Sequence, residues 1–187
     1  MSHPLEKFIF CPVCGSNDFN VSSFKSKKCK KCGLELFMNP SSACVAIVED
    51  NGKLLVVKRK LPPAEGTLDL PGGFADIGET AEQSVQRELL EETGLRAKTV
   101  EYLFSEPNLY HFSGIEIPTQ DLFFLCKVDN VQQAEASDDA AECIWCPIKQ
   151  LDPELFGLQS IQRGVKRYLS CYDSSHKQAC DEDLFCP

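Results

Sequence analysis

Apolar runs separated by turn residues divide the middle of the chain into short segments that are typical of β-strands. Residues 43–48 (ACVAIV) and 53–57 (KLLVV) lie on either side of Asp50-Asn51-Gly52, a sequence that is typical of a hairpin turn. A β-hairpin is therefore predicted there. Further strands are predicted near residues 100–105, 121–128 and 142–147.

Helical spacing replaces strand spacing between residues 80 and 94. The apolar positions of this segment, which form one stripe toward a core, are Ala81, Val85 and Leu89. Thr80 can cap the start of a helix, and Gln83 can complete a capping box three residues later. Gly94 follows at the position where a glycine in the left-handed conformation would end the helix. A helix is therefore predicted between Thr80 and Gly94.

A last amphipathic helix is predicted from about Gln159 to Leu169. Strands that surround two helices indicate an α/β sandwich as the fold class. Residues 171–187 are polar and carry the acidic run Asp181-Glu182-Asp183, so we expect a loose tail there.

The predicted helix carries an unusual concentration of negative charge. Glu88, Glu91 and Glu92 fall within barely more than one turn, and like charges at this spacing destabilise a helix. A bound cation would neutralise them, and clustered carboxylate oxygens suit a hard ion such as Mg²⁺. The alternative is an acidic face in contact with solvent. That alternative does not explain the flanking glycines or the Pro71-Gly72-Gly73 lead-in.

Two Cys-X-X-Cys motifs lie near the N-terminus, and a glycine follows each of them. Cys11 and Cys14 are separated from Cys29 and Cys32 by fourteen residues. Four thiolates in this arrangement complete a closed tetrahedral site, which is typical of structural zinc. The intervening stretch is too short and polar to build its own core, so metal would supply the folding energy. A redox role would require a βαβ context, which is lacking.

The charge of the chain is unevenly distributed. The formal net charge is −9, yet residues 1–40 carry six lysines against three acids, and residues 41–187 carry thirteen basic residues against twenty-five acids. An acidic body argues against non-specific binding of nucleic acid, which needs a basic surface. It is compatible with an enzyme whose divalent ions bridge to an anionic substrate.

The sequence contains no segment with the roughly 18 apolar residues of a membrane span. Residues 1–10 lack the organisation of a signal peptide. We therefore expect a cytoplasmic protein without a membrane partner. The eleven cysteines are an odd number, and the spacing of the first four favours metal binding over a disulfide scaffold.

The segment from Gly73 to Leu95 resembles the signature box of the Nudix hydrolases at every defining position. The positions that carry the resemblance are Gly73, Glu79, Arg87, Glu88, Glu91, Glu92 and Gly94, with apolar Leu89 and Leu95. The resemblance implies an α/β/α sandwich with a mixed sheet. It also implies divalent-metal-dependent hydrolysis of the pyrophosphate bond of a nucleoside diphosphate linked to another moiety.

The resemblance also implies chemical roles. Glu88, Glu92 and Glu142 would hold Mg²⁺ or Mn²⁺ ions against the pyrophosphate, and these ions lower the pKa of a bound water. Glu91 either ligates a further ion or takes a proton from that water, and the sequence leaves both roles open. Gly72 resembles the family residue that lends a backbone carbonyl to the metal.

Two further assignments come from the family. Glu142 is assigned to the metal because it stands three residues before the single tryptophan, in a predicted late strand. Asp138 and Asp139, just upstream, are less favoured candidates for a fourth acid. Glu79 and Arg87 resemble a structural pair that braces the loop against the helix and takes no part in the chemistry.

A Cys₄ ribbon directly before a Nudix domain is similar to the NADH pyrophosphatase branch of the family. That branch carries a Ser-Gln-Pro-Trp motif associated with recognising the nicotinamide dinucleotide, whereas this chain reads Ser105-Glu106-Pro107-Asn108. An ionised Glu106 only accepts hydrogen bonds and would disfavour an extra phosphate. Tyr110 and Phe112 follow and offer the stacking that the tryptophan would have given. The substrate-binding candidates are Ser105, Glu106, Tyr110 and Phe112.

These observations predict a zinc ribbon at residues 1–38, a Nudix domain at residues 39–170 and a polar tail at residues 171–187. The predicted activity is that of a Nudix pyrophosphohydrolase with Mg²⁺ or Mn²⁺ and a structural Zn²⁺. Its small-molecule substrate would be a dinucleotide such as NADH, or ADP-ribose or a nucleotide sugar. A homodimer is expected because the family often dimerises.

Two other functions are left open. The first is a Nudix-fold ligand sensor whose ribbon binds nucleic acid or protein, although an intact box argues against it. The second is removal of a nucleotide cap from RNA by the same chemistry. The ribbon lysines that permit it are Lys25, Lys27, Lys28, Lys30 and Lys31. A solvated basic loop is the plainer explanation of those lysines.

Overall fold

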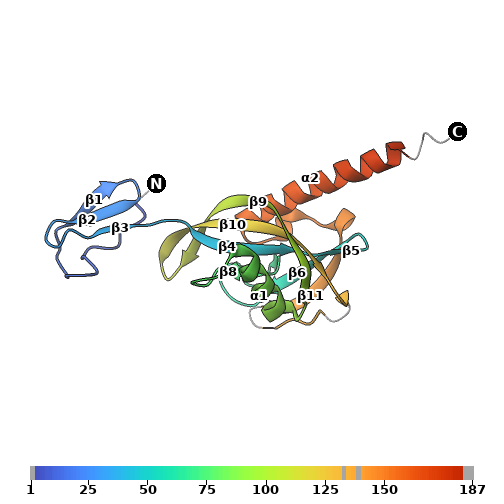
Figure 1. Cartoon of the computed structure of the whole chain (residues 1–187), viewed down its shortest axis with the longest axis horizontal. Helices are drawn as coiled ribbons and strands as arrows, with labels where there is room; N and C mark the ends of the chain where they lie inside the picture. Colours follow the sequence, from blue (N-terminus) through green and yellow to red (C-terminus); the bar gives the residue numbers. More distant parts are fainter. Residues whose placement is uncertain (1–2, 132–133, 138–139, 183–187) are drawn as a thin grey trace. The chain divides into compact units, whose positions relative to one another are not determined.

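The computed structural model of the chain describes residues 3–131, 134–137 and 140–182, with side chains as far as residue 172. The chain divides into two compact units (Figure 1). The first, called the ribbon unit, comprises Met1–Ser41 and Asn108–Gln120. The second, called the sandwich unit, comprises Ser42–Pro107 and Asp121–Pro187.

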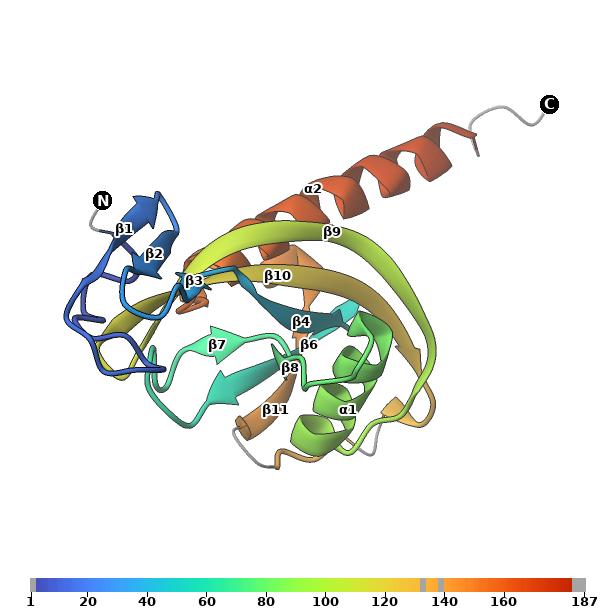
Figure 2. The ribbon, with the colours of Figure 1, turned by 60° about the vertical axis from the view of Figure 1, so that its left-hand side comes forward.

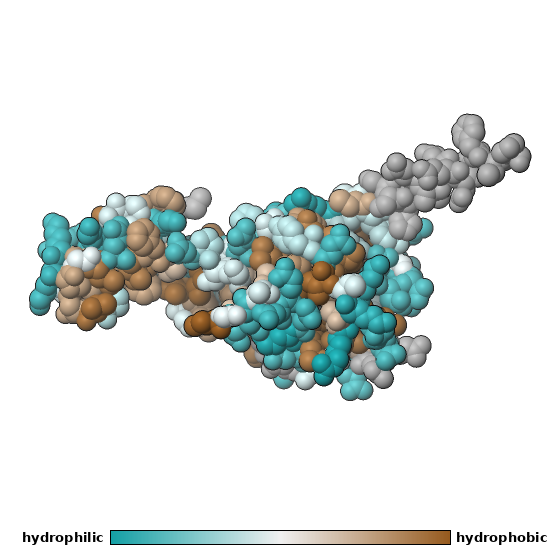
Figure 3. All heavy atoms as spheres, in the orientation of Figure 1, coloured by the Kyte–Doolittle hydropathy of each residue, from teal (hydrophilic) through white to brown (hydrophobic). Residues whose placement is uncertain are grey.

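The ribbon unit contains a small antiparallel sheet in the order β1-β2-β3. Its strands are β1 (Phe19–Ser23), β2 (Ser26–Cys29) and β3 (Glu35–Phe37). Apolar side chains reach its surface (Figure 3), among them Ile9, Phe10, Val13, Val21 and Phe24. A module that buries so little apolar surface gains little stability from its own core. It therefore needs another source of folding energy.

The sandwich unit is built on two further sheets. One has the order β8-β4-β10-β9, with β8 (Gly72–Phe74), β4 (Ser41–Ile47), β10 (Ile115–Val128) and β9 (Ala97–Phe112). The other has the order β11-β6-β5, with β11 (Ala140–Pro147), β6 (Lys53–Arg59), β5 (Glu49–Asp50) and β7 (Leu68–Asp69), which pairs with β6. A parallel bridge joins Leu68 to Phe156 beside antiparallel pairs, so the sheet is mixed, as predicted.

One face of β4 packs toward the C-terminal helix. Val45 and Ile47 lie in a core with Ile161 and Val165 of α2 (Gln159–Glu182). Every second residue of a strand points to the same face, so these two β4 positions must share a side. This face of the strand is therefore the one that α2 covers.

The opposite face of β4 packs toward the acidic helix. Cys44 and Ala46 belong to a second core with Val85 and Leu89 of α1 (Ala81–Thr93). Because the two β4 faces meet different helices, the strands lie between α1 and α2, which are separated in Figure 2. The predicted α/β/α sandwich is confirmed.

The ends of α1 form as predicted. The Thr80 hydroxyl accepts from the Gln83 amide at 3.2 Å, and the Gln83 side chain accepts from the Thr80 amide at 2.8 Å. Gly94 has φ 70°, and its N–H donates to Leu90 at 2.9 Å. The capping box and the left-handed C-cap are both confirmed.

The C-terminal helix is longer than the sequence predicts. It follows the 3-10 turns η2 (Ile148–Gln150) and η3 (Pro153–Leu155), and it runs to Glu182. Residues 171–182, expected as part of a loose tail, are therefore helical, because neither glycine nor proline interrupts them. Gly164 is an interior residue of this helix. Glycine is required at this position, because a Cβ there would overlap the Phe123 ring.

The β9–β10 hairpin is also longer than predicted. The sequence placed strands near residues 100–105 and 121–128, whereas β9 and β10 run side by side to a turn between Phe112 and Ile115 (Figure 2). Proline within each extension argued against a strand.

None of the described helices is both long and apolar enough to cross a membrane.

Replacing Leu89 by alanine is expected to destabilise the protein by about 2–5 kcal/mol. The side chain of Leu89 is fully buried on the core face of α1, so its truncation leaves a cavity. Leu155→Ala makes the same chemical change at a side chain that is 55% exposed, and should cost less than about 0.5 kcal/mol. Urea unfolding measures both values. Equal costs would contradict the assignment of Leu89 to the core.

Candidate active site and zinc centre

Two glycines bring the loop before α1 against the helix. The Gly72 N–H donates to Glu92 Oε2 at 3.0 Å. A Cβ on Gly72 would overlap the Cys44 carbonyl, and a Cβ on Gly73 would lie 2.5 Å from Glu88 Cδ. Only glycine allows this approach, so the Gly72-Gly73 pair places the loop directly beside two of the predicted metal-binding glutamates.

Arg87 joins the loop to the helix. Its Nε donates to Glu79 Oε1 at 2.8 Å and its Nη2 to Glu79 Oε2 at 3.0 Å, which makes a bidentate pair. Nη2 also donates to the Phe74 carbonyl at 3.0 Å. The bonded guanidinium holds the pKa of Glu79 below its usual range. These contacts are those expected of a brace between loop and helix.

The same guanidinium lies between two of the clustered carboxylates. Arg87 Nη1 donates to Glu88 Oε1 at 2.8 Å and to Glu91 Oε2 at 2.9 Å. One positive charge thus compensates part of the repulsion that the sequence analysis identified. The pKa of Arg87 lies above its already high value, chiefly because of the hydrogen bonds to Glu79. Burial lowers this pKa, and the hydrogen bonds to Glu88 and Glu91 raise it further.

Burial acts against the charge on Glu88. Desolvation raises the pKa of this carboxyl above its ordinary value, although Arg87 works in the opposite direction. The side chain is only 15% exposed, and the Glu92 residue is 9% exposed. Carboxylates this poorly hydrated gain more from a nearby cation than exposed ones do.

The oxygen donors on α1 fit a hard divalent ion such as Mg²⁺ in kind and in charge. Glu88 and Glu91 meet through Arg87, and Glu92 is held by the Gly72 amide. Across the residues that the structure describes, however, only cysteines bring three or more ligand atoms within 4.8 Å of one another.

The fourth predicted metal-binding residue stands on another element. Glu142 is exposed on β11, where it pairs across the strands with Lys58 of β6, beside a register shift. Strand β11 is in contact with α1, the helix that carries Glu88, Glu91 and Glu92. The less favoured candidates at positions 138 and 139 lie outside the described residues.

The predicted substrate residues fall into two places. Ser105 and Glu106 lie on the part of β9 that belongs to the sandwich unit. Tyr110 and Phe112 lie in the ribbon unit, where their rings stack with centroids 6.4 Å apart and planes at 21°. The structure therefore separates the four candidates into two pairs.

Glu106 is held by the C-terminal helix. Its carboxylate accepts from Arg163 Nε at 3.0 Å and lies 3.8 Å from Arg167 Nη1, and the side chain is 16% exposed. Arg163 also donates to the Pro107 carbonyl, and Arg167 stacks on Phe104 at 4.4 Å. Two arginines thus offset the negative charge that replaces the neutral amide of the related motif.

Sequence reasoning missed Arg163 and Arg167. The available signal was weak: two basic residues at helical i, i+4 spacing in a predicted amphipathic helix. Such a pair is ordinarily a solvated face. Its partner on β9 lies 57 residues away, so no local pattern identifies it.

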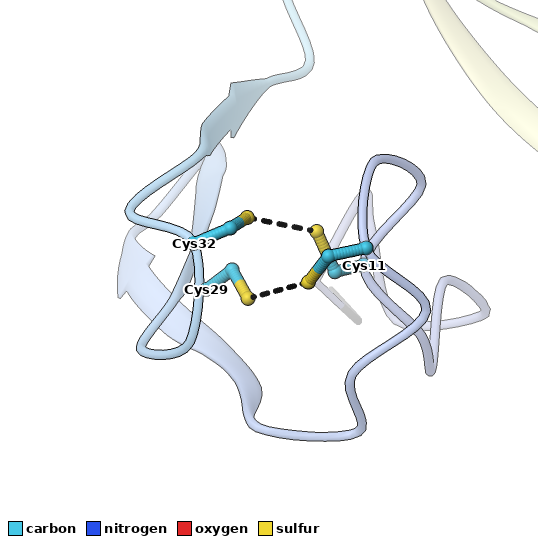
Figure 4. A group of neighbouring side chains, drawn as sticks. Cys11, Cys29 and Cys32 are labelled. Carbon is cyan, nitrogen blue, oxygen red and sulfur yellow. Dashed lines mark hydrogen bonds between the residues drawn. The ribbon is translucent and has the colours of Figure 1, made fainter.

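The four predicted zinc ligands converge (Figure 4). The sulfurs of Cys11 and Cys32 lie 3.6 Å apart, as do those of Cys14 and Cys29, and all four lie within 4.8 Å of one another. Tetrahedral zinc with bonds of about 2.3 Å requires sulfurs about 3.8 Å apart. The cluster therefore fits a structural Zn²⁺.

The comparisons with known proteins agree with this geometry. The NUDIX domain profile matches residues 38–169. The chain belongs to the Nudix family. It is therefore a Nudix hydrolase, as predicted, and members of this family act on small-molecule nucleotides and generally need divalent metal.

Two Nudix relatives illustrate the range of substrates. An ADP-ribose pyrophosphatase of Methanocaldococcus jannaschii is 40% identical over 155 residues, which cover 80% of this chain and 86% of the relative. The NAD-capped RNA hydrolase NudC of Haemophilus influenzae strain PittGG is 27% identical over 184 residues, which cover 97% of this chain and 67% of the relative. The predicted likeness to the NADH pyrophosphatase branch is confirmed.

A solved Nudix structure supports the same fold. The NUDIX hydrolase from Nitrosomonas europaea matches with a TM-score of 0.67 and 25% identity, over 86% of this chain and 90% of that one. The alignment thus extends over nearly all of both chains, and the Nudix architecture accounts for most of this molecule.

The Cys₄ cluster predicts one Zn²⁺ per chain. Cys29→Ser should reduce the zinc content to less than about a tenth, because three thiolates no longer close the site. Cys171→Ser replaces an exposed cysteine of α2 and should keep the zinc. Plasma mass spectrometry of the purified variants measures the metal. Equal zinc contents in the two variants would contradict the assignment.

Proposed function

We propose that this chain hydrolyses the pyrophosphate bond of ADP-ribose and related nucleoside diphosphates, giving AMP and ribose 5-phosphate from ADP-ribose. The observation that carries the proposal is the complete acidic box, held by Arg87 and the Gly72 amide, in a chain 40% identical to an ADP-ribose pyrophosphatase. A domain that only bound its ligand would have no chemical use for so costly a cluster of carboxylates.

The box supplies the ligands for Mg²⁺ or Mn²⁺. Glu88, Glu92 and Glu142 would hold the ions, with the Gly72 carbonyl as a further donor. When bound, the ions neutralise the pyrophosphate oxygens and acidify a water molecule. Glu91 is either a further ligand or the base that takes the proton from that water. Its 46% exposed side chain is compatible with both roles.

The choice of ADP-ribose over NADH is supported by the segment after the box. Asn108 stands where the related motif has a tryptophan, so one aromatic platform is missing. ADP-ribose has no nicotinamide ring and does not need that platform. The adenine ring is assigned to the stacked pair Tyr110 and Phe112. Ser105 and Glu106 would accept hydrogen bonds from ribose hydroxyls.

Removal of an NAD cap from RNA is the second candidate. It is favoured by the likeness to NudC, which extends over 97% of this chain. The lysines of the ribbon unit would attract the RNA phosphates, and the chemistry at the pyrophosphate would be the same. This activity would add to hydrolysis of small nucleotides without replacing it.

Other features of the chain stay predictions. We propose that a ribbon of residues 1–38 precedes a Nudix domain of residues 39–170, and that the chain acts as a homodimer in the cytoplasm. The family match at residues 38–169 supports the domain boundaries to within one residue at each end.

A substrate panel with Mg²⁺ or Mn²⁺ tests the proposal. It comprises ADP-ribose, NADH, NAD⁺, nucleotide sugars, dinucleoside polyphosphates and a short NAD-capped RNA. We expect kcat/KM for ADP-ribose to exceed that for NADH by about tenfold or more, a difference that one missing ring contact can produce. Preference for NADH would overturn the substrate assignment. Binding of these ligands without turnover would favour the ligand sensor.

Glu92→Gln should lower kcat for ADP-ribose by at least about a hundredfold, because a neutral amide is a poor ligand for a hard cation. The fold should survive, since the glutamine oxygen can still accept the Gly72 N–H. Glu82→Gln, an exposed position on the same helix, is the matched control. Steady-state assays and thermal melts of both variants are compared, and full activity of Glu92→Gln would remove Glu92 from the metal site.

A further inference from the structure

The outer end of the β9–β10 hairpin belongs to the ribbon unit. Residues 108–120, called the hairpin tip, group with residues 1–41, although β9 and β10 continue into the sandwich unit. The tip turns tightly at Ser113 (φ 49°) and Gly114 (φ 75°). A two-stranded hairpin is marginally stable by itself in water. The tip therefore depends on contacts from outside its own two strands.

Lys7 provides such a contact. Its ammonium donates to the Gly114 carbonyl at the turn, 107 residues away in the sequence. An added Cβ on Gly114 would meet only the Lys7 ammonium, at 3.7 Å, so the two residues lie in direct contact. The bond is exposed, and a single exposed bond contributes modestly. Its effect on the tip depends on how firmly Lys7 itself is held.

The segment that carries Lys7 is fixed to the ribbon at both ends. His3 Nε2 donates to the Ser23 carbonyl at 2.9 Å, and Lys27 Nζ donates to the Phe8 carbonyl at 2.8 Å. Between them Leu5 is 1% exposed. The Lys7 backbone is thus anchored by two hydrogen bonds and a buried side chain.

These anchors lead to the zinc centre. Lys27 is 8% exposed, and its ammonium lies 5.4 Å from the centre of the Phe19 ring. Phe19 packs in one small core with the zinc ligands Cys11 and Cys29. Because so small a core gains little stability of its own, bound zinc is expected to stabilise the anchors of Lys7.

We propose that Lys7 is a positioning residue through which the zinc ribbon orders the hairpin tip, and with it the stacked rings of Tyr110 and Phe112. Phe112 is 57% exposed, so one side of the stack is open to a ligand ring. The effect on catalysis rests on the function proposed above, in which this pair stacks on adenine. Zinc then governs nucleotide recognition through the tip.

Hydrolysis itself should be unaffected. The described hydrogen bonds and ion pairs of Arg87 all come from the sandwich unit. Disordering the tip removes a stacking surface and leaves the box intact. The proposal therefore predicts a change in KM with little change in kcat.

The kinetic test compares three variants of the full chain. Lys7→Met should raise KM for ADP-ribose by about threefold to tenfold, the size of one lost hydrogen bond, with kcat nearly unchanged. Lys7→Arg keeps a donor and should recover most of the loss. Lys149→Met removes an exposed lysine of the sandwich unit and should behave as wild type. Equal effects of Lys7→Met and Lys149→Met, or no rescue by arginine, would overturn the proposal.

Hydrogen exchange gives a readout that needs no substrate. Amides of residues 108–120 should exchange faster in Lys7→Met, and also in wild type after zinc is removed by a chelator, while protection in α1 stays constant. Unchanged exchange at the tip in either case would refute the role of the ribbon. If the chain hydrolyses no member of the substrate panel, the proposed function fails, and the exchange result still decides this inference.

Discussion

Four groups from the loop and helix lie around Arg87, whose single positive charge offsets part of the repulsion within the acidic box. Glu79, Glu88, Glu91 and the Phe74 carbonyl all accept from this guanidinium. Without it, the carboxylates of Glu88, Glu91 and Glu92, at i, i+3 and i+4 spacing, would face one another across a partly buried surface. Arginine suits this position because a planar fork with five N–H donors serves several acceptors at once, which a lysine ammonium does much less well.

That network works only because the loop lies so close to α1. The Gly72 amide reaches Glu92, and Gly73 leaves room for the Glu88 carboxylate. The strand that pairs with β8 sends Cys44 and Ala46 into the core under α1 and Val45 and Ile47 into the core under α2. Apolar packing in the sandwich thus sets the distance between the loop and the helix. The charged side chains of the box make their contacts at that distance.

What the sequence could predict was mostly local. The capping box of α1, its left-handed end and the four zinc ligands each follow from residues a few positions apart, where chain geometry leaves little choice. The full length of β9 was not predictable, because Pro107 argues against a strand interior. β9 lies at the edge of its sheet, where a missing N–H need not break a ladder. The pairing of Glu106 with Arg163 spans 57 residues and left no local pattern.

This difference in range separates the acidic box from the segments that are proposed to recognise the substrate. Contacts that hold the box join residues no more than 20 positions apart, as from Gly72 to Glu92. Contacts that hold the proposed recognition segments join β9 to α2, and Lys7 to Gly114 across 107 positions. Under the proposed function, a change in the ribbon or in α2 would therefore alter substrate recognition while Arg87 and its carboxylates keep their arrangement. The acidic box is encoded in one segment, whereas the proposed substrate contacts depend on residues that are distant in the sequence.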